Sequence, residues 1–401
     1  MIDREQLVLR NTSMARAFHS VPLKHHLRRA ALRLIARLPI PPSRHPDAEP
    51  ERILIIRPDH LGDALLTTPA IRALRRARPN TEIHALVGAW SANVFAPFPE
   101  IDLVLTLPFP GFARGAASQL LTDTYLLAWR AARHLRKLRY NTALICRPDH
   151  WWGALIAFLA GIPNRIGHNH PDTAPFLTTA VPFEPAHAVI QSARLVERLI
   201  DHPLKSADLA LTFPIDPDDR AWVDGYLEEW GLNPRERLFV IHPGSGTWVK
   251  QWDETGWAFI ADTLAEEWSA TPVFTGSEGE LAMIRRIAEK MQAQPCIMAG
   301  DTRIGTLAAL YERSHVVLGP DSGPLHLAAA VGTPTVALFG PADPDEFGTW
   351  GSRERHAVLF SDIGCRPCRV LDWGNDDPQF HPCVRAISRA RVLAAARTVT
   401  A

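Results

Sequence analysis

The sequence predicts an α/β protein built from two doubly wound domains that face each other across a cleft. Its 401 residues are enough for two ordinary domains, each with its own hydrophobic core. From Arg52 onward, short apolar runs alternate with helical stretches, which is typical of βα units around a parallel sheet. A second series of the same kind begins at Leu238, after a stretch that contains Pro214 and Pro217.

Each series predicts its own strands and helices. In the first we expect strands at 53–56, 83–87, 104–107 and 143–146, and helices at 64–78, 124–138 and 153–159. In the second we expect strands at 239–242, 272–275, 315–318 and 335–339, and helices at 255–268, 281–291 and 324–331. A helix over 217–230 follows a hinge near Pro214. The predicted domains are a basic extension (1–51), an N-terminal domain (52–213), a C-terminal domain (214–384) and a terminal helical segment (385–401).

The composition of the chain argues against several classes of protein. There are 43 basic and 43 acidic side chains, and this balance argues against a nucleic-acid binder, which needs a surplus of positive charge. The longest apolar stretch, 153–162, is too short to cross a bilayer, and the first residues do not resemble a signal peptide. Five cysteines in so long a chain do not form a disulfide scaffold. We therefore expect a cytoplasmic protein in a reducing compartment.

The N-terminal segment is basic and amphipathic. Residues 1–52 contain ten Lys or Arg and five Asp or Glu. A helix is expected over 23–38, ended by the prolines of 39–42, with several apolar residues on one side: Leu27, Ala31, Leu34, Ile35 and Leu38. Two interpretations stay open: a helix docked on its own domain, or a weak peripheral anchor to the anionic face of the inner membrane.

Ligands of open parallel sheets bind beyond the carboxyl ends of the strands, so the loops that follow the strands are the informative ones. The first such loop is 57–63, in which Gly62 permits a tight turn before a helix. Asp63 stands at the start of that helix. Its carboxylate could cap the helix, which is the commoner role, or act as a general base.

The second loop, 242–252, combines glycines, hydroxyls and one cation. Gly244 and Gly246 allow close approach of a ligand, Ser245 offers a hydroxyl, and Lys250 is a point charge suited to phosphate. The chain contains no P-loop motif, and this loop lacks the third glycine of a dinucleotide fingerprint, which argues against a kinase or a dehydrogenase. The alternative is a solvated glycine turn with a surface lysine.

The third loop, 319–326, lies between a strand and a helix. Gly323 and Pro324 at the first helical turn would leave N–H groups free for a diphosphate. Asp321 and His326 flank this turn. A single histidine on such a helix usually packs in the core or faces solvent. The glycines and prolines concentrated in this strand-turn-helix segment favour a ligand-binding role for His326 instead.

These loops together resemble the heptosyltransferases of glycosyltransferase family 9. The motifs that carry the resemblance run in order from about Arg52 to Pro341: Arg57-x-x-x-Leu-Gly-Asp63, Thr68-Pro69-Ala70, His242-Pro-Gly-Ser, Lys250-x-Trp252, Gly276-x-x-x-Glu280, Asp321-Ser-Gly-Pro-x-His326, Gly332-x-Pro334 and Leu338-Phe-Gly-Pro341. The resemblance implies a GT-B fold and transfer of heptose, with inversion, from an ADP-sugar to a lipid-linked lipopolysaccharide core acceptor. It implies no metal and no cofactor.

Roles carried over by position follow from the same resemblance. It makes Asp63 the catalytic base and Lys250 the partner of the leaving diphosphate. It places Ser245 at the diphosphate and Glu280 at the ribose. The full set of implied substrate-binding residues is Arg57, Gly62, Ser245, Glu280, Asp321, Ser322, Gly323, Leu325 and His326. These roles fit the chemistry, because inverting transfer needs one carboxylate for the acceptor proton and fixed positive charge at the diphosphate.

Two features depart from the family, and two other functions compete with transfer. Some heptosyltransferases have a lysine at the position of Arg57, and the basic extension is longer than the family needs. One competing function is a noncatalytic module that binds a sugar nucleotide or a protein partner in envelope glycan assembly. The other is a sugar-nucleotide epimerase, for which we identify no additional acid or base.

A group of cysteines and a histidine lies near the end of the chain. Cys365, Cys368, His381 and Cys383 have the spacing of two ligand pairs and could supply four ligands to a structural zinc. The interpretation we favour is that these are reduced thiols packing a loop.

Overall fold

The computed structural model describes residues 3–45, 47–112, 121–200, 202–233 and 235–401. The chain divides into two compact units, here called the N-terminal unit (21–210) and the C-terminal unit (211–401 with 1–20). The expected extension is thus shared between the units, because α1 (Arg4–His19) clusters with the C-terminal unit and α2 (Leu23–Ile35) with the N-terminal unit. The domain limits expected from the sequence remain predictions.

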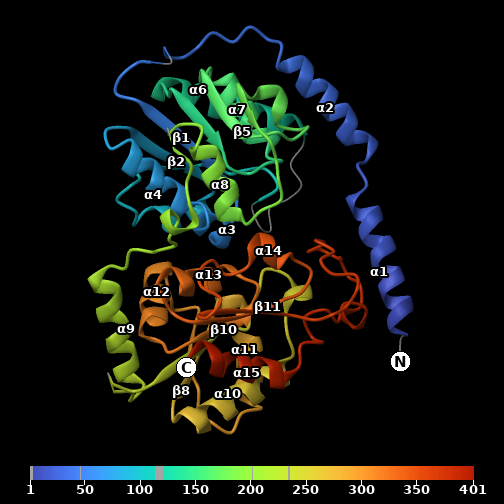
Figure 1. The fold of residues 1–401 in the computed structure, drawn as a ribbon, viewed down its shortest axis with the longest axis vertical. Helices are drawn as coiled ribbons and strands as arrows, with labels where there is room; N and C mark the ends of the chain where they lie inside the picture. Colours follow the sequence, from blue (N-terminus) through green and yellow to red (C-terminus); the bar gives the residue numbers. More distant parts are fainter. Residues whose placement is uncertain (1–2, 46, 113–120, 201, 234) are drawn as a thin grey trace. The chain divides into compact units, whose positions relative to one another are not determined.

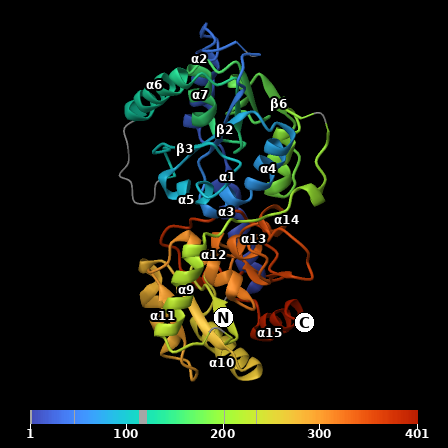
Figure 2. The same ribbon diagram turned by 90° about the vertical axis from the view of Figure 1, so that its left-hand side faces the viewer.

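The N-terminal unit contains a parallel six-stranded sheet in the order β3-β2-β1-β4-β5-β6 (Figure 1). Its strands are β1 (Arg52–Arg57), β2 (Glu82–Val87), β3 (Leu103–Thr106), β4 (Thr142–Ile145), β5 (Asn164–His168) and β6 (Thr179–Val181). The other helices of the unit are α3 (Leu61–Leu65), α4 (Thr68–Ala77), α5 (Ala92–Phe95), α6 (Leu121–Leu138), α7 (Trp151–Leu159) and α8 (Ala188–Val196). Short 3₁₀ turns are η1 (Ala89–Ser91), η2 (Ala174–Phe176) and η3 (Ser206–Asp208). Helix α4 packs beside α8, and α6 packs beside α7 on the other side of the sheet (Figure 2).

The C-terminal unit repeats this architecture. Its parallel sheet has the order β12-β11-β10-β7-β8-β9. The strands are β7 (Leu238–Ile241), β8 (Thr271–Gly276), β9 (Cys296–Ala299), β10 (Val317–Pro320), β11 (Thr335–Phe339) and β12 (His356–Phe360). The helices besides α1 are α9 (Pro217–Glu229), α10 (Glu254–Trp268), α11 (Leu281–Ala288), α12 (Ile304–Arg313), α13 (Gly323–Ala330), α14 (Pro344–Phe347) and α15 (Arg389–Val399). Its 3₁₀ turns are η4 (Trp248–Lys250), η5 (Glu278–Glu280) and η6 (Pro378–Phe380).

Both sheets are therefore wound identically. In each, the first strand along the chain pairs with the second on one side and with the fourth on the other, so the strand order reverses between the first and fourth strands. This doubly wound arrangement confirms the predicted fold class. The points of reversal are the carboxyl ends of β1 and β4 and of β7 and β10, where such sheets bind ligands.

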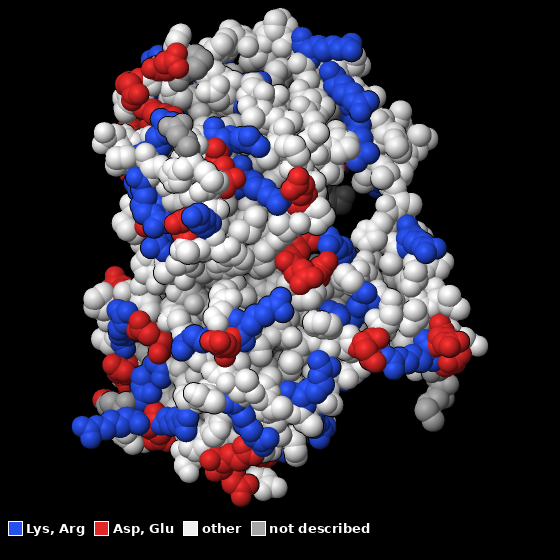
Figure 3. Space-filling model, in the orientation of Figure 1, with Lys and Arg blue, Asp and Glu red and all other residues white. Residues whose placement is uncertain are grey.

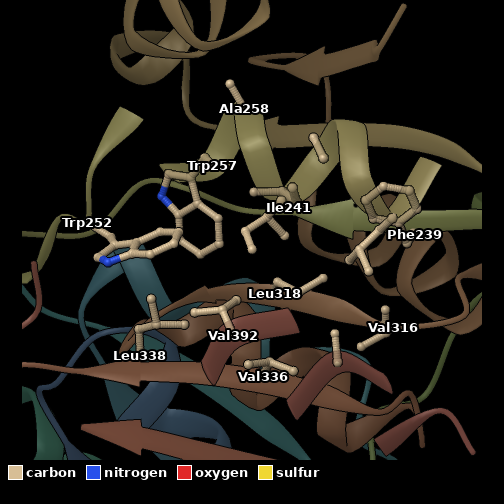
Figure 4. Packing of buried hydrophobic residues seen from close by; sticks show 14 of the residues in the cluster. Phe239, Ile241, Trp252, Trp257, Ala258, Val316, Leu318, Val336, Leu338 and Val392 are labelled. Atoms are coloured by element: carbon tan, nitrogen blue, oxygen red, sulfur yellow. The ribbon is translucent and has the colours of Figure 1, made fainter. Parts of the chain in front are cut away.

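The hydrophobic core of the C-terminal unit shows how the sheet is covered. Buried residues of the central strands, among them Ile241, Leu318 and Leu338, face the inner side of α10 and α15 (Figure 4). Trp252 and Trp257 lie edge to face with ring centroids 4.8 Å apart. This core fixes the strands whose ends carry the candidate site.

One predicted helix is wrong in its extent. The helix expected over 64–78 is two helices, α3 and α4, which divide at Leu66 and Thr67. The proline at position 69 has no N–H to continue the helix. The Thr68 hydroxyl instead donates a hydrogen bond to the Leu65 carbonyl, 2.8 Å away. The break turns the chain after Asp63.

Several elements were not predicted. These are α1, α5, α8, α12, α14, β5, β6, β9 and β12. In α1 the buried side consists of Leu7, Asn11 and Ala15, and the asparagine interrupts the apolar pattern that a core-facing helix normally shows. Among the described residues, no helix has both the length and the apolar character needed to span a bilayer.

Candidate active site

Two loops meet at the strand-order reversal of the N-terminal unit. Strands β1 and β4 are neighbours, and the same tetrapeptide, Arg-Pro-Asp-His, begins at the last residue of β1 (57–60) and one residue beyond β4 (147–150). Only the first copy lies in a loop that was singled out from the sequence. Because parallel strands end at the same edge of a sheet, the two copies lie side by side.

A buried carboxylate connects the two copies. Asp59 is 3% exposed and forms ion pairs with both Arg57 and Arg147; its Oδ2 lies 3.0 Å from Arg57 Nε. Arg57 Nη1 also donates to the Cys146 carbonyl at 2.8 Å. Burial alone would raise the pKa of Asp59, but the two guanidinium groups lower it overall, so the carboxylate stays charged. The matching Asp149 is half exposed and pairs with Arg147.

Asp63, the expected catalytic base, belongs to the same network. It is the third residue of α3, whose N-cap is His60, so Asp63 lies within the first turn and not at the capping position. Its Oδ1 is 3.3 Å from Arg57 Nη2, and its side chain is one-third exposed. Gly62 precedes it in the same turn. Arg57 thus connects Asp63 to the buried Asp59.

An ion pair occupies the corresponding position of the C-terminal unit. Lys250 Nζ lies 2.6 Å from Asp321 Oδ2, and both side chains are largely buried. Lys250 ends the 3₁₀ turn η4, and Asp321 follows β10, where its N–H donates to the Leu338 carbonyl. The structure therefore brings two of the expected site residues, from separate loops, into direct contact.

The N-terminal turn of α13 lies next to this pair. Ser322 is the N-cap residue, but its hydroxyl makes no capping bond, and no described residue forms a hydrogen bond with its buried Oγ. A Cβ added at Gly319 would lie only 2.6 Å from the His242 carbonyl oxygen, so only glycine permits this approach of β10 to β7. Leu325 and His326 are both buried, and Leu325 packs against Gly319.

The Glu280 carboxylate packs against Gly244 in the loop that follows β7. Its Oε2 accepts hydrogen bonds from the Ser277 N–H at 2.7 Å and from the Ser277 hydroxyl at 2.8 Å. A Cβ at Gly244 would lie 2.0 Å from Glu280 Oε1, so the glycine leaves room for the carboxylate. Ser245 donates to the Thr247 carbonyl at 2.7 Å. Burial lowers the pKa of nearby His242 to about 4, so this ring is neutral at neutral pH.

The four candidate zinc ligands do not form a metal site among the described residues. They line one small cavity, yet the described residues contain no group of three or more His, Cys, Asp or Glu side chains placed to hold a metal ion. The ring of His381 is turned to Asp376, with Nε2 2.8 Å from Oδ2, and lies against Trp373. Burial raises the pKa of Cys383 to about 12, which keeps this thiol protonated and suits a packing role.

The expected site residues thus form two groups, one in each unit. The N-terminal group is Arg57, Gly62 and Asp63; the C-terminal group is Ser245, Glu280, Lys250, Asp321, Ser322, Gly323, Leu325 and His326. Asp59 and Arg147 were not among the residues expected from the sequence, although the repeated tetrapeptide was a signal for both. Both groups lie beyond carboxyl ends of strands, where doubly wound sheets bind their ligands.

Comparison with known proteins decides the family. The model of glycosyltransferase family 9 (heptosyltransferase) matches residues 128–373, more than half of the chain. The chain belongs to glycosyltransferase family 9. It is a glycosyltransferase, the first of the functions considered from the sequence.

Relatives of this family 9 protein are similar over most of their length. It is 27% identical to lipopolysaccharide heptosyltransferase 3 of Escherichia coli K12 over 298 residues, which cover 72% of this chain and 82% of the relative. A solved family 9 glycosyltransferase from Veillonella parvula is 24% identical, with a TM-score of 0.73 over 87% of this chain and 97% of the other. The solved ADP-heptose lipopolysaccharide heptosyltransferase II of E. coli is 21% identical, with a TM-score of 0.67 over 87% and 98%. These structures establish the shared GT-B fold.

Proposed function

We propose that this protein transfers a heptose from ADP-heptose to a lipopolysaccharide core acceptor, with inversion at the anomeric carbon and without a metal ion. The names of its relatives support the donor and the acceptor. The observation that carries the chemistry is the pairing of Lys250 with Asp321 at the N-terminal turn of α13. It holds a cation at the edge where doubly wound sheets bind their ligands.

The leaving diphosphate would be bound by three kinds of donor. An ammonium group has three N–H donors, and Asp321 needs one of them, so Lys250 retains donors for phosphate oxygens. The unpartnered Ser322 hydroxyl and the first N–H groups of α13 supply the others. This positive charge stabilises the diphosphate as its bond to the sugar breaks, which is the task a metal ion performs in other transferases.

Asp63 would remove the proton from the acceptor hydroxyl as that oxygen attacks the anomeric carbon. The attack forms the new glycosidic bond, the bond to the diphosphate breaks, and the proton goes to the carboxylate. A single displacement of this kind inverts the anomeric configuration. Arg57 holds the carboxylate through its Nη2, and Glu280 would bind the hydroxyls of the ribose.

The test is a donor screen with ADP-, UDP-, GDP- and TDP-sugars, with and without a lipopolysaccharide core oligosaccharide. We expect acceptor-dependent release of ADP from ADP-heptose and a product whose anomeric configuration, determined by NMR, is opposite to that of the donor. Turnover with another nucleotide sugar and none with ADP-heptose would refute the assignment of ADP-heptose as the donor. A product with retained configuration would refute the mechanism.

A further inference from the structure

Helix α2 has an inner face that docks on the N-terminal unit. Leu32 is 1% exposed and belongs to the core of that unit. Arg29 binds Asp172 through two hydrogen bonds, from Nε to Oδ1 at 2.9 Å and from Nη2 to Oδ2 at 3.2 Å. Arg28 lies over the ring of Trp151. The helix is therefore part of the folded unit, as the first of the two sequence interpretations expected.

The outer face of the same helix is a line of leucines. Leu23, Leu27, Leu34 and Leu38 are 74%, 65%, 64% and 51% exposed. They are spaced by four, seven and four residues, which places them on one side of a helix and of its continuation. We call these four residues the leucine stripe. Docking through Leu32 turns the stripe away from the core, so the fold of the unit does not use it.

Basic side chains flank the leucine stripe. Lys24, Arg33 and Arg37 are exposed, and within the described residues none of them forms an ion pair. Residues 6–46 contain eight Lys or Arg and no Asp or Glu. Figure 3 shows a row of blue side chains along α2. No carboxylate of this segment offsets the positive charge around the stripe.

We propose that the leucine stripe and its flanking cations dock on the surface of an anionic lipid bilayer. Exposed apolar residues bordered by cations are what an interfacial helix needs, because the leucines enter the acyl boundary while the cations meet the lipid phosphates. A water-soluble protein partner would also cover leucines, but the absence of acidic side chains over 41 residues favours a uniformly negative surface. The inference does not depend on the proposed reaction, since binding to lipid needs neither donor nor acceptor.

The test is co-sedimentation of the full chain with vesicles of phosphatidylglycerol and phosphatidylcholine, and with phosphatidylcholine alone. We expect binding only to the anionic vesicles and release at high salt. The double variant Leu27→Asn/Leu34→Asn should bind at least about tenfold more weakly. The Arg33→Glu/Arg37→Glu variant should bind the anionic vesicles at least about twentyfold more weakly, because each cation near an anionic surface raises the affinity about fivefold.

Two controls match these variants. Leu371→Asn changes an exposed leucine of the C-terminal unit, and Arg235→Glu/Arg353→Glu makes the same change of charge at exposed arginines of that unit. Both should bind within twofold of the parent. Circular dichroism melting curves of all four variants should match that of the parent, because every changed side chain is exposed.

Three results would overturn the proposal. The first is failure of the parent to bind anionic vesicles at low salt. The second is an equal loss of vesicle binding in the stripe variants and in their control variants. The third is a dimer, measured by light scattering, that the Leu27→Asn/Leu34→Asn variant abolishes; this would assign the stripe to a second copy of the chain. Each result is independent of whether ADP-heptose is the donor.

Discussion

Replacing Asp59 by asparagine should destabilise the N-terminal unit far more than the same change at Asp149. Both aspartates stand third in an Arg-Pro-Asp-His tetrapeptide at the end of a strand, and both pair with Arg147. Their surroundings differ, because the side chain of Asp59 is 3% exposed and that of Asp149 is 50% exposed. The pair of variants therefore compares a buried carboxylate held by two arginines with a half-exposed carboxylate held by one.

The expected loss of unfolding free energy follows from the arginine that each variant leaves without its charged partner. Asp59→Asn removes the charge that faces Arg57, whose side chain is only 7% exposed. Removing one partner of a buried ion pair typically costs about 3–5 kcal/mol, and asparagine keeps the shape and one acceptor, so we expect about 3 kcal/mol. Asp149→Asn breaks an exposed pair with Arg147 and should cost less than about 1 kcal/mol.

Hydrogen–deuterium exchange measures this loss of unfolding free energy separately in each unit. Amides of β1 and β4 report the stability of the N-terminal unit, and amides of β7 and β10 serve as the internal reference. The pKa of Asp59 is lowered in the folded state, so its stabilisation is present above the ordinary carboxyl pKa and is lost as the pH falls through the lowered value. The difference between parent and Asp59→Asn should shrink in acid. Equal protection in the Asp59→Asn and Asp149→Asn variants at neutral pH would refute the reasoning.

Three further predictions concern the proposed reaction. Asp63→Asn should lower turnover by about two to four orders of magnitude with an unchanged melting curve, because the acceptor proton loses its base; normal turnover would leave Asp63 as a structural residue. Lys250→Ala should weaken ADP binding and turnover together, since the cation contacts the diphosphate before and during bond breaking; unchanged ADP affinity by calorimetry would remove it from the site. EDTA should leave activity intact, and loss that magnesium or manganese restores would contradict the metal-free assignment.

The sequence predicted several strands from apolar runs, among them β1 and β11, but it missed β9 and β12, which also contain apolar runs. Strands β1, β2 and β11 are buried on both faces, and such strands consist almost entirely of apolar residues. Strand β5 contains Asn164, Arg165 and His168, so it shows no run of this kind. Its strand conformation comes from pairing with β4, a tertiary contact that no local pattern records.

The loops that carry the candidate site were singled out from the sequence, but the charge pairing within these loops was not. The rule that ligands bind beyond strand ends selected Asp63, Lys250 and Asp321 from their loops. It could not show that Asp59 is buried and Asp149 exposed, because the two stand in identical tetrapeptides. The difference arises from the strands they follow and from what packs over each loop, which only the folded chain determines.

Each unit holds a buried aspartate against a basic side chain at the point where its strand order reverses. Asp59 holds Arg57 and Arg147, and Asp321 holds Lys250. A cation buried without a partner would be costly, so the carboxylate allows it to stay at the edge of the sheet. Guanidinium and ammonium groups have more N–H donors than one carboxylate uses, and the remaining donors can bind a ligand oxygen. These basic side chains are therefore held in position before a ligand arrives, and binding does not have to order them.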